Sequence, residues 1–135
     1  MQVVDSYRTY NVITTQDLEA ALIIRHNENV NSFWLNPDTY EFPQLGVLVK
    51  GDLASLTFFP KADSAGFISV GRIANLGPGD STPFPIDKNP GDDLYVRNDA
   101  VLPWATALMA AKEFFDTEQL PKSIEWREEG FVDNG

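Results

Sequence analysis

The last quarter of this 135-residue chain constrains its fold more than any other stretch. Apolar residues recur at every third or fourth position through residues 103–116, so they share one face of a helix. Pro103 suits the first turn of that helix, where its missing N–H costs nothing, and Pro121 prevents the helix from continuing. The apolar residues of this face are Trp104, Ala107, Leu108, Ala111 and Phe115, with Phe114 beside them.

A short strand follows the helix at residues 122–127. Side chains alternate along a strand, so Ile124 and Trp126 point to one face and Glu125 and Arg127 to the other. We therefore expect this strand to join a sheet that the helix covers. The core residues predicted from this closing segment are Trp104, Leu108, Phe115, Ile124 and Trp126.

The clearest hairpin lies in the middle of the chain. Two apolar runs, 45–50 and 53–59, flank Gly51-Asp52, and a two-residue Gly-X loop suits a type II′ turn whose twist matches that of the strands. A third run at 66–72 extends this pattern, which predicts an antiparallel meander.

The N-terminal third predicts a strand near residues 7–13, a helix from Thr14 to about His26, and a short strand at 31–35. Thr14 can cap the helix, because its hydroxyl accepts from a free amide, and Asp17 suits the first turn. A further short strand is expected at 92–97. We predict a single α+β domain over 1–135, with a mainly antiparallel sheet of about five or six strands and an N-terminal and a C-terminal helix packed on it.

Residues 75–93 are rich in proline, glycine and aspartate. Because proline cannot donate a backbone hydrogen bond and glycine has no side chain to pack, this composition predicts one long loop. Residues 128–135 are expected to form a tail.

The net charge of −10 and the isoelectric point near 4.3 disfavour binding to nucleic acid or to anionic membranes. The absence of cysteine excludes disulfides, thiolate metal sites and a cysteine nucleophile. The N-terminus lacks a basic segment followed by an apolar one, so we expect no signal peptide, and no apolar run approaches the ~20 residues of a membrane span. We expect a cytoplasmic protein, favoured as a monomer.

Patterns that could carry catalysis are weak. His26 is the single histidine and falls near a helix end, where its charged form would complement the helix dipole. Ser69 lies in a G-x-x-S-x-G run that resembles a nucleophile elbow only superficially, and ordinary sheet is the favoured interpretation. Residues 87–93 have calcium-loop oxygen density without the EF-hand pattern. We predict no catalytic residue, no metal and no cofactor.

Two stretches carry a resemblance to a known family. Leu-Thr-Phe-Phe-Pro at 56–60 is followed by Gly-Phe-Ile-Ser-Val-Gly at 66–71, and the helix, turn and strand of 103–126 end in Ile-Glu-Trp. Across roughly residues 45–127 the pattern resembles the first immunity-protein family of bacterial polymorphic toxin systems. Glu118 departs from it, because the family usually turns on a glycine after the threonine at position 117.

The resemblance implies an α+β protein that binds and neutralises a cognate toxin, often a nucleic-acid deaminase, by occluding its active site. Acidic residues gather before and on the closing helix, where they could complement a basic toxin. Two alternatives are a small enzyme with a carboxylate-only site and an acidic accessory module that is charged for solubility. The partner-binding residues predicted are Asp80, Phe84, Asp87, Asp92, Asp93, Glu113 and Asp116, with Trp34 and Tyr40 as further anchors if exposed.

Overall fold

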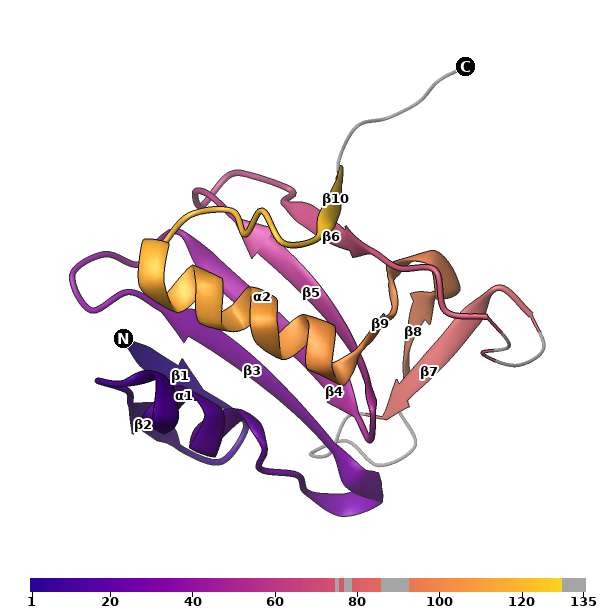
Figure 1. The fold of residues 1–135 in the computed structure, drawn as a ribbon, viewed down its shortest axis with the longest axis horizontal. Coiled ribbons are helices and arrows are strands. Elements are labelled where there is room, and N and C mark those ends of the chain that lie inside the picture. Colours follow the sequence, from indigo (N-terminus) through magenta and orange to yellow (C-terminus); the bar gives the residue numbers. More distant parts are fainter. Residues whose placement is uncertain (75, 77–78, 86–92, 130–135) are drawn as a thin grey trace.

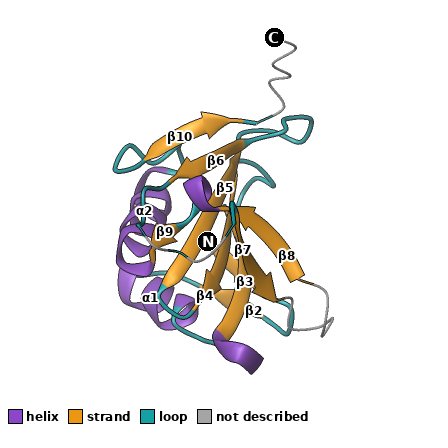
Figure 2. Cartoon of the chain, turned by 90° about the vertical axis from the view of Figure 1, so that its right-hand side faces the viewer, coloured by secondary structure: helices purple, strands orange, loops and turns teal. Residues whose placement is uncertain are grey.

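The computed structural model describes residues 1–74, 76, 79–85 and 93–129, and it has three layers (Figures 1 and 2). Two helices cover one face of a large antiparallel sheet, and a small two-stranded sheet lies against the other face. The large sheet has the strand order β10-β6-β5-β4-β3-β1-β2, with β9 paired to β5 at its side. Its strands are β1 (Gln2–Val4), β2 (Thr9–Asn11), β3 (Val30–Asn36), β4 (Gln44–Lys50), β5 (Leu53–Phe59), β6 (Phe67–Val70), β9 (Leu102–Pro103) and β10 (Glu125–Glu128).

The α+β class is confirmed, but the predicted five or six strands are too few. The large sheet alone has eight strands, and two more form the small sheet. Two of the additional strands are very short: β1 has three residues and β9 has two. Strands of this length are too short to show an alternating pattern in the sequence. The strand expected at 7–13 forms as β2 over the shorter range Thr9–Asn11, and β1 precedes it at Gln2–Val4.

The central hairpin forms as the sequence predicts. Lys50 pairs with Leu53 across a two-residue loop, and Gly51 has a φ of 56°, which a residue without Cβ adopts at little cost. The meander continues from β5 to β6, where Phe58 pairs with Phe67. Apart from its terminal residues, β4 is apolar on both faces, which is typical of a central strand covered on both sides.

Helix α1 (Thr15–Leu22) begins at the predicted cap. Thr14 and Asp17 form a reciprocal capping box, in which the Asp17 amide donates to the Thr14 hydroxyl and the Thr14 amide donates to the Asp17 carboxylate. The helix ends four residues before His26, which instead precedes the short 3₁₀ turn η1 (Asn27–Asn29). The helix-dipole role suggested for His26 is therefore wrong.

Helix α2 (Trp104–Thr117) begins directly after Pro103. Its buried face is centred on Ala107, Ala110, Ala111 and Phe114, and these alanines let the helix lie close to the sheet. Phe114 stands edge-on to Phe58 of β5, with ring centroids 6.0 Å apart. The five residues predicted as core from this segment are half-buried and pack around the margin of the core: Trp104, Leu108, Phe115, Ile124 and Trp126.

The two helices are also joined by charged side chains. The guanidinium of Arg25 lies 4.6 Å from the ring centroid of Trp104, and Lys112 pairs with Glu19 at 3.5 Å.

At the C-terminus of α2, Glu118 adopts a left-handed φ of 53° and its amide donates to the Phe114 carbonyl. The turn therefore has the geometry that a glycine usually provides, although glutamate occupies it.

The prediction of one long loop over 75–93 is wrong for residues 81–85. These residues form β7 (Ser81–Pro85), which pairs with β8 (Asp93–Arg97) in the small sheet. Pro83 and Pro85 are tolerated because this sheet has only two strands, so each strand has a free edge where no amide is required. The predicted strand at 92–97 is confirmed as β8 from residue 93 onward.

Ser69 ties the sheet to the short 3₁₀ turn η2 (Asn98–Ala100). The buried hydroxyl accepts from the Leu56 amide at 3.1 Å and donates to the Ala100 carbonyl at 2.9 Å. Ser69 is thus a structural residue, as the sequence favoured. Beside it, a Cβ on Gly71 would lie 1.8 Å from the Val101 carbonyl oxygen, so this close approach requires glycine.

Candidate partner-binding surface

The outer face of the large sheet is left uncovered by the helices, and the β7–β8 hairpin lies against it (Figure 2). Between this face and the hairpin lies a cavity of about 300 Å³. We call it the outer groove. Its lining includes Trp34, Leu48, Thr57 and Phe59 from the sheet and Phe84 and Leu94 from the hairpin.

Trp34 is the most prominent side chain of the outer groove. It remains 44% exposed although it lies in the middle of β3. Its ring centroid is 5.8 Å from that of Phe59, and its six-membered ring lies over Gly46, the residue paired with it on β4. Because Gly46 has no side chain, the indole can lie flat against the sheet.

The hairpin wall of the groove is fixed to the sheet by a second apolar cluster. Phe84, Val96, Ala100 and Val101 are buried there against side chains of the sheet, Leu48 among them. Phe84 is only 2% exposed and its ring is part of this apolar cluster, although it also lines the outer groove. Its contact with a partner stays a prediction.

Polar contacts hold the same hairpin. Lys50 Nζ donates to the Pro83 carbonyl at 3.0 Å, and the Thr82 hydroxyl donates to Asn98 Oδ1 at 2.6 Å. The Asn98 amide in turn donates to the Asp80 carbonyl at 2.8 Å. Hydrogen bonds at the start and in the middle of β7 thus hold the hairpin wall in place.

Two of the predicted acidic contacts lie on the hairpin side of the molecule. Asp80 and Asp93 are both exposed, just before β7 and at the start of β8. Asp93 pairs with Pro85 and is followed by Leu94, both of which line the outer groove, so Asp93 is a neighbour of the lining in the hairpin. Asp87 and Asp92 lie outside the described residues.

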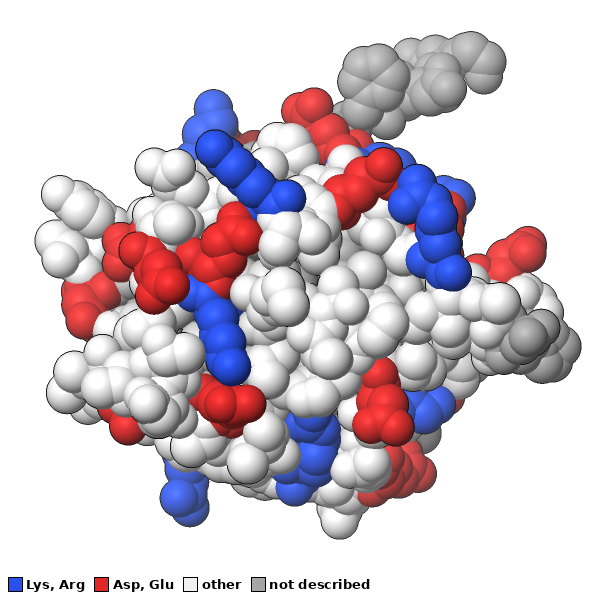
Figure 3. Space-filling view, viewed as in Figure 1, with Lys and Arg blue, Asp and Glu red and all other residues white. Residues whose placement is uncertain are grey.

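The other two predicted acids lie on the helical side. Asp116 is exposed near the end of α2. Glu113 accepts hydrogen bonds from the amides of Lys122 and Ser123, so it supports the turn that leads into β10. On this face acidic and basic side chains are intermixed (Figure 3). The predicted acids therefore do not form one patch.

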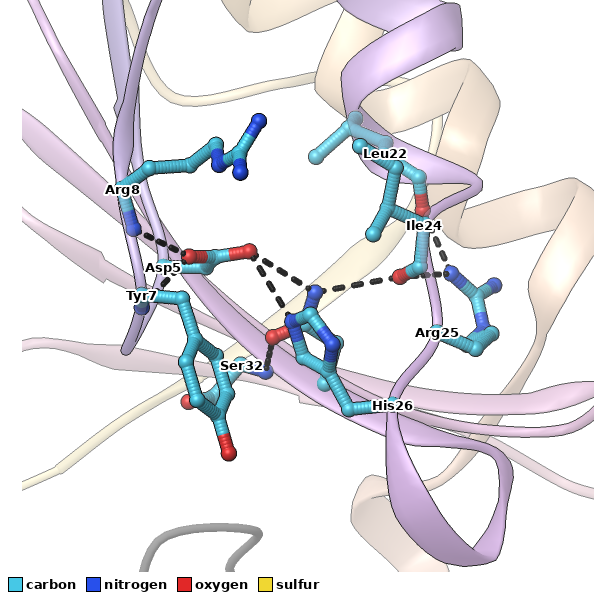
Figure 4. Close-up of polar contacts among 9 residues, drawn as sticks. Asp5, Tyr7, Arg8, Leu22, Ile24, Arg25, His26 and Ser32 are labelled. Atoms are coloured by element: carbon cyan, nitrogen blue, oxygen red, sulfur yellow. Dashed lines mark hydrogen bonds and ion pairs between the residues drawn. The ribbon is translucent and has the colours of Figure 1, made fainter.

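A buried carboxylate, Asp5, lies next to Ser6 and Asn31 of the groove lining (Figure 4). Asp5 Oδ1 accepts from the amides of Tyr7 and Arg8 at 2.8 and 2.9 Å. Its Oδ2 lies 3.2 Å from both Asn31 Nδ2 and His26 Nε2. Burial raises the pKa of Asp5, but these four hydrogen bonds together outweigh it, so the pKa lies below its ordinary value.

This cluster does not have the form of a catalytic site. The Asp5 side chain has no exposed surface, and both its oxygens are engaged by the protein. A general acid or base must reach its substrate, directly or through one water. Within the described residues no group of three or more histidine, aspartate or glutamate side chains is placed to hold a metal ion, and most of the suggested calcium loop at 87–93 lies outside them.

The comparison with curated proteins favours one of the alternatives that the sequence left open. The chain is 29% identical over 100 residues to the double-stranded DNA deaminase immunity protein of Burkholderia cenocepacia (strain H111), a match that covers 74% of this chain and 76% of the relative. The chain is a homologue of a deaminase immunity protein. The resemblance found from the sequence is thereby confirmed, although no family model matches the chain.

The outer groove is a candidate contact surface that the sequence does not predict. The sequence offers Trp34 as a possible anchor, but its position beside Phe59 follows only from the pairing of three strands. One signal was available: the outer-facing positions of β3 and β5 mix hydroxyl and aromatic residues, Ser32 and Trp34 on one strand, Thr57 and Phe59 on the other.

No described helix is long and apolar enough to cross a bilayer.

Proposed function

We propose that this protein is a non-catalytic immunity protein that binds one cognate deaminase toxin domain and occludes its active site. The homology to a deaminase immunity protein carries the proposal. The kind of toxin, the occlusion and the one-to-one stoichiometry are our inferences. The complex forms in the cytoplasm, where a nucleic-acid-directed toxin would act, and the immunity protein enters it as a monomer.

The charge of the chain supports this proposal. A domain that acts on nucleic acid presents basic surface to the phosphates, and a protein of net charge −10 is attracted to such a surface over long range. Many cations in the described part already pair with carboxylates, for example Arg72 with Glu125 and Arg97 with Asp99. Asp80 and Asp93 have no such ion pair among the described residues and lie on the side of the outer groove.

The structural role of the buried Asp5 carboxylate supports the proposal that this protein has no catalytic activity. Asp5 and His26 are the pair that most resembles an acid–base dyad, and they hold β1, β3 and the 3₁₀ turn together. Replacing Asp5 or His26 should lower stability, and variants that remain folded should still protect against the toxin.

The test is co-expression with the cognate toxin domain, which we expect to be encoded immediately upstream of the gene for this chain. We expect the chain to restore growth of a bacterial host and to inhibit deamination of DNA by the purified toxin at an equimolar ratio. Growth arrest that persists although soluble, folded protein is present would contradict the proposal. A catalytically inactive toxin serves as the control for expression load.

The acidic contribution is tested in the same assay. Neutralising Asp80, Asp92 and Asp93 together should slow association with the toxin and reduce its dependence on salt, since rim charges act mainly on the association rate. Neutralising Asp116, which lies on the helical side, is the matched control. Equal effects from the two sides would show that the acids act only through net charge.

A further inference from the structure

We propose that the outer groove receives one uncharged apolar side chain of the toxin domain, and that basic residues flank this side chain on the toxin. The inference rests on the proposed function and adds to it the contact surface and the chemistry of the partner segment. It places the main anchor on the outer face of the sheet and not on the closing helix.

The size of the groove suits a single side chain. Its volume of about 300 Å³ is at the lower end of the range for ligand sites, roughly 300–1,000 Å³. A whole helix could not enter, because Phe84, Pro85 and Leu94 of the hairpin wall face the sheet across it. The hydrogen bond from Lys50 to Pro83 holds this wall in place.

The lining determines the charge of the occupant. Within the described residues the lining carries no Asp, Glu, Lys or Arg, and its polar groups are hydroxyls and an amide, such as Ser32, Thr57 and Asn31. A cation buried there would lose its hydration without gaining a carboxylate, which is costly. An aromatic or aliphatic side chain meets no such penalty, and the rings of Trp34 and Phe59 offer it a preformed contact.

The surroundings of the groove favour basic flanking residues on the partner. Asp93 is exposed and directly precedes Leu94 of the lining. The chain as a whole carries a net charge of −10. The partner segment therefore combines a central uncharged anchor with positive charge around it, the arrangement of a desolvated hot spot with a charged rim.

Trp34 has the properties of such a hot spot. It is partly exposed, yet its ring is held against Gly46 and beside Phe59, so little freedom is lost when a partner covers it. Other exposed apolar side chains, such as Met109 on α2, lie outside this groove.

The experiment measures binding of the purified, catalytically inactive toxin domain from the upstream gene to the full chain by titration calorimetry. We expect Trp34→Ala to weaken binding by about 30-fold or more, as for a hot-spot residue. Met109→Ala, which truncates an exposed residue of the helical face, should leave binding unchanged. Leu94→Ser, on the hairpin wall, provides a second loss-of-contact variant in case Trp34→Ala affects folding.

A second pair of variants separates the groove from simple charge attraction. Thr57→Asp makes the protein more acidic inside the groove, and Met109→Asp makes the same charge change on the helical face. If the groove is filled by an apolar side chain, Thr57→Asp weakens binding and Met109→Asp does not. If only negative charge matters, both variants bind as well as the wild type or better, and the inference is overturned.

The outcomes distinguish this inference from the proposed function. Wild-type protein that does not bind the toxin domain at all overturns both. Wild-type protein that binds and protects, together with Trp34→Ala and Leu94→Ser variants that bind equally well, overturns only the groove. Thermal unfolding of each variant shows whether a loss of binding reflects a loss of fold.

Discussion

Trp34 and Gly46 face each other across β3 and β4, and a Cβ at position 46 would lie 3.0 Å from Cζ3 of the indole ring. This contact is tighter than ordinary van der Waals contact, so the ring must move to admit a side chain, and we expect Gly46→Val to displace Trp34. The indole N–H resonance of Trp34 should move, and toxin binding should weaken. Thr57→Val, a nearly isosteric change at the position paired with Gly46 on β5, is the control and should leave the resonance nearly unmoved.

Neighbouring phenylalanines of α2 should differ in their contribution to stability. Phe114 is fully buried against Phe58, whereas Phe115 is half-buried at the margin of the core. Phe114→Ala should lower the free energy of unfolding by about 3–5 kcal/mol, and Phe115→Ala by clearly less. Urea denaturation measures both, and a larger loss for Phe115→Ala would contradict the packing described.

The Asp5 cluster should contribute to stability in a pH-dependent manner. Asp5→Asn replaces an ionised acceptor of four hydrogen bonds, and we expect a loss of about 2 kcal/mol at pH 7. Because the pKa of Asp5 is lowered in the folded protein, its contribution is fully present above the unfolded value of ~3.9 and is lost as the pH falls through the folded pKa.

The free energy difference between wild type and Asp5→Asn should therefore shrink below about pH 4. Urea denaturation at pH 7 and at pH 3 measures this change. Asp116→Asn, an exposed carboxylate exchanged in the same way, should have little effect at neutral pH. A difference that stays constant between the two pH values would argue against an ionised, hydrogen-bonded Asp5.

Glu118 offers a stabilising substitution. Its left-handed φ of 53° costs an ordinary residue about 1–2 kcal/mol, which glycine avoids, although glycine also adds entropy to the unfolded chain. Glu118→Gly should raise the free energy of unfolding by about 0.5–1 kcal/mol. Glu118→Ala removes the same carboxylate without relieving the backbone and should not stabilise. If alanine stabilises as much as glycine, the gain comes from charge.

Local signals determined much of this fold. The Thr14–Asp17 capping box, the Gly51 turn and the two prolines around α2 each act within a few residues, so their consequences can be read directly from the sequence. The short strands β1 and β9 form because longer neighbours offer them free edges, which no local pattern records.

The surroundings of the predicted site residues depend on tertiary contacts, which the sequence alone does not show. Phe84 lies in a proline-rich segment that looks like a loop, yet its ring is buried against the sheet by the second apolar cluster. Glu113 belongs to an acidic run, yet it accepts from two backbone amides before β10. The outer groove needs three paired strands and a hairpin to exist at all, so no contiguous motif could predict it.

The central claim is that this chain neutralises a toxin by direct binding through the outer face of its sheet. The most direct measurement is inhibition of DNA deamination by the purified toxin domain, titrated with wild-type protein and with Trp34→Ala. We predict complete inhibition at one equivalent of wild type and a shift of the curve by about 30-fold or more for Trp34→Ala. Undiminished deamination in the presence of excess folded wild-type protein would contradict the account.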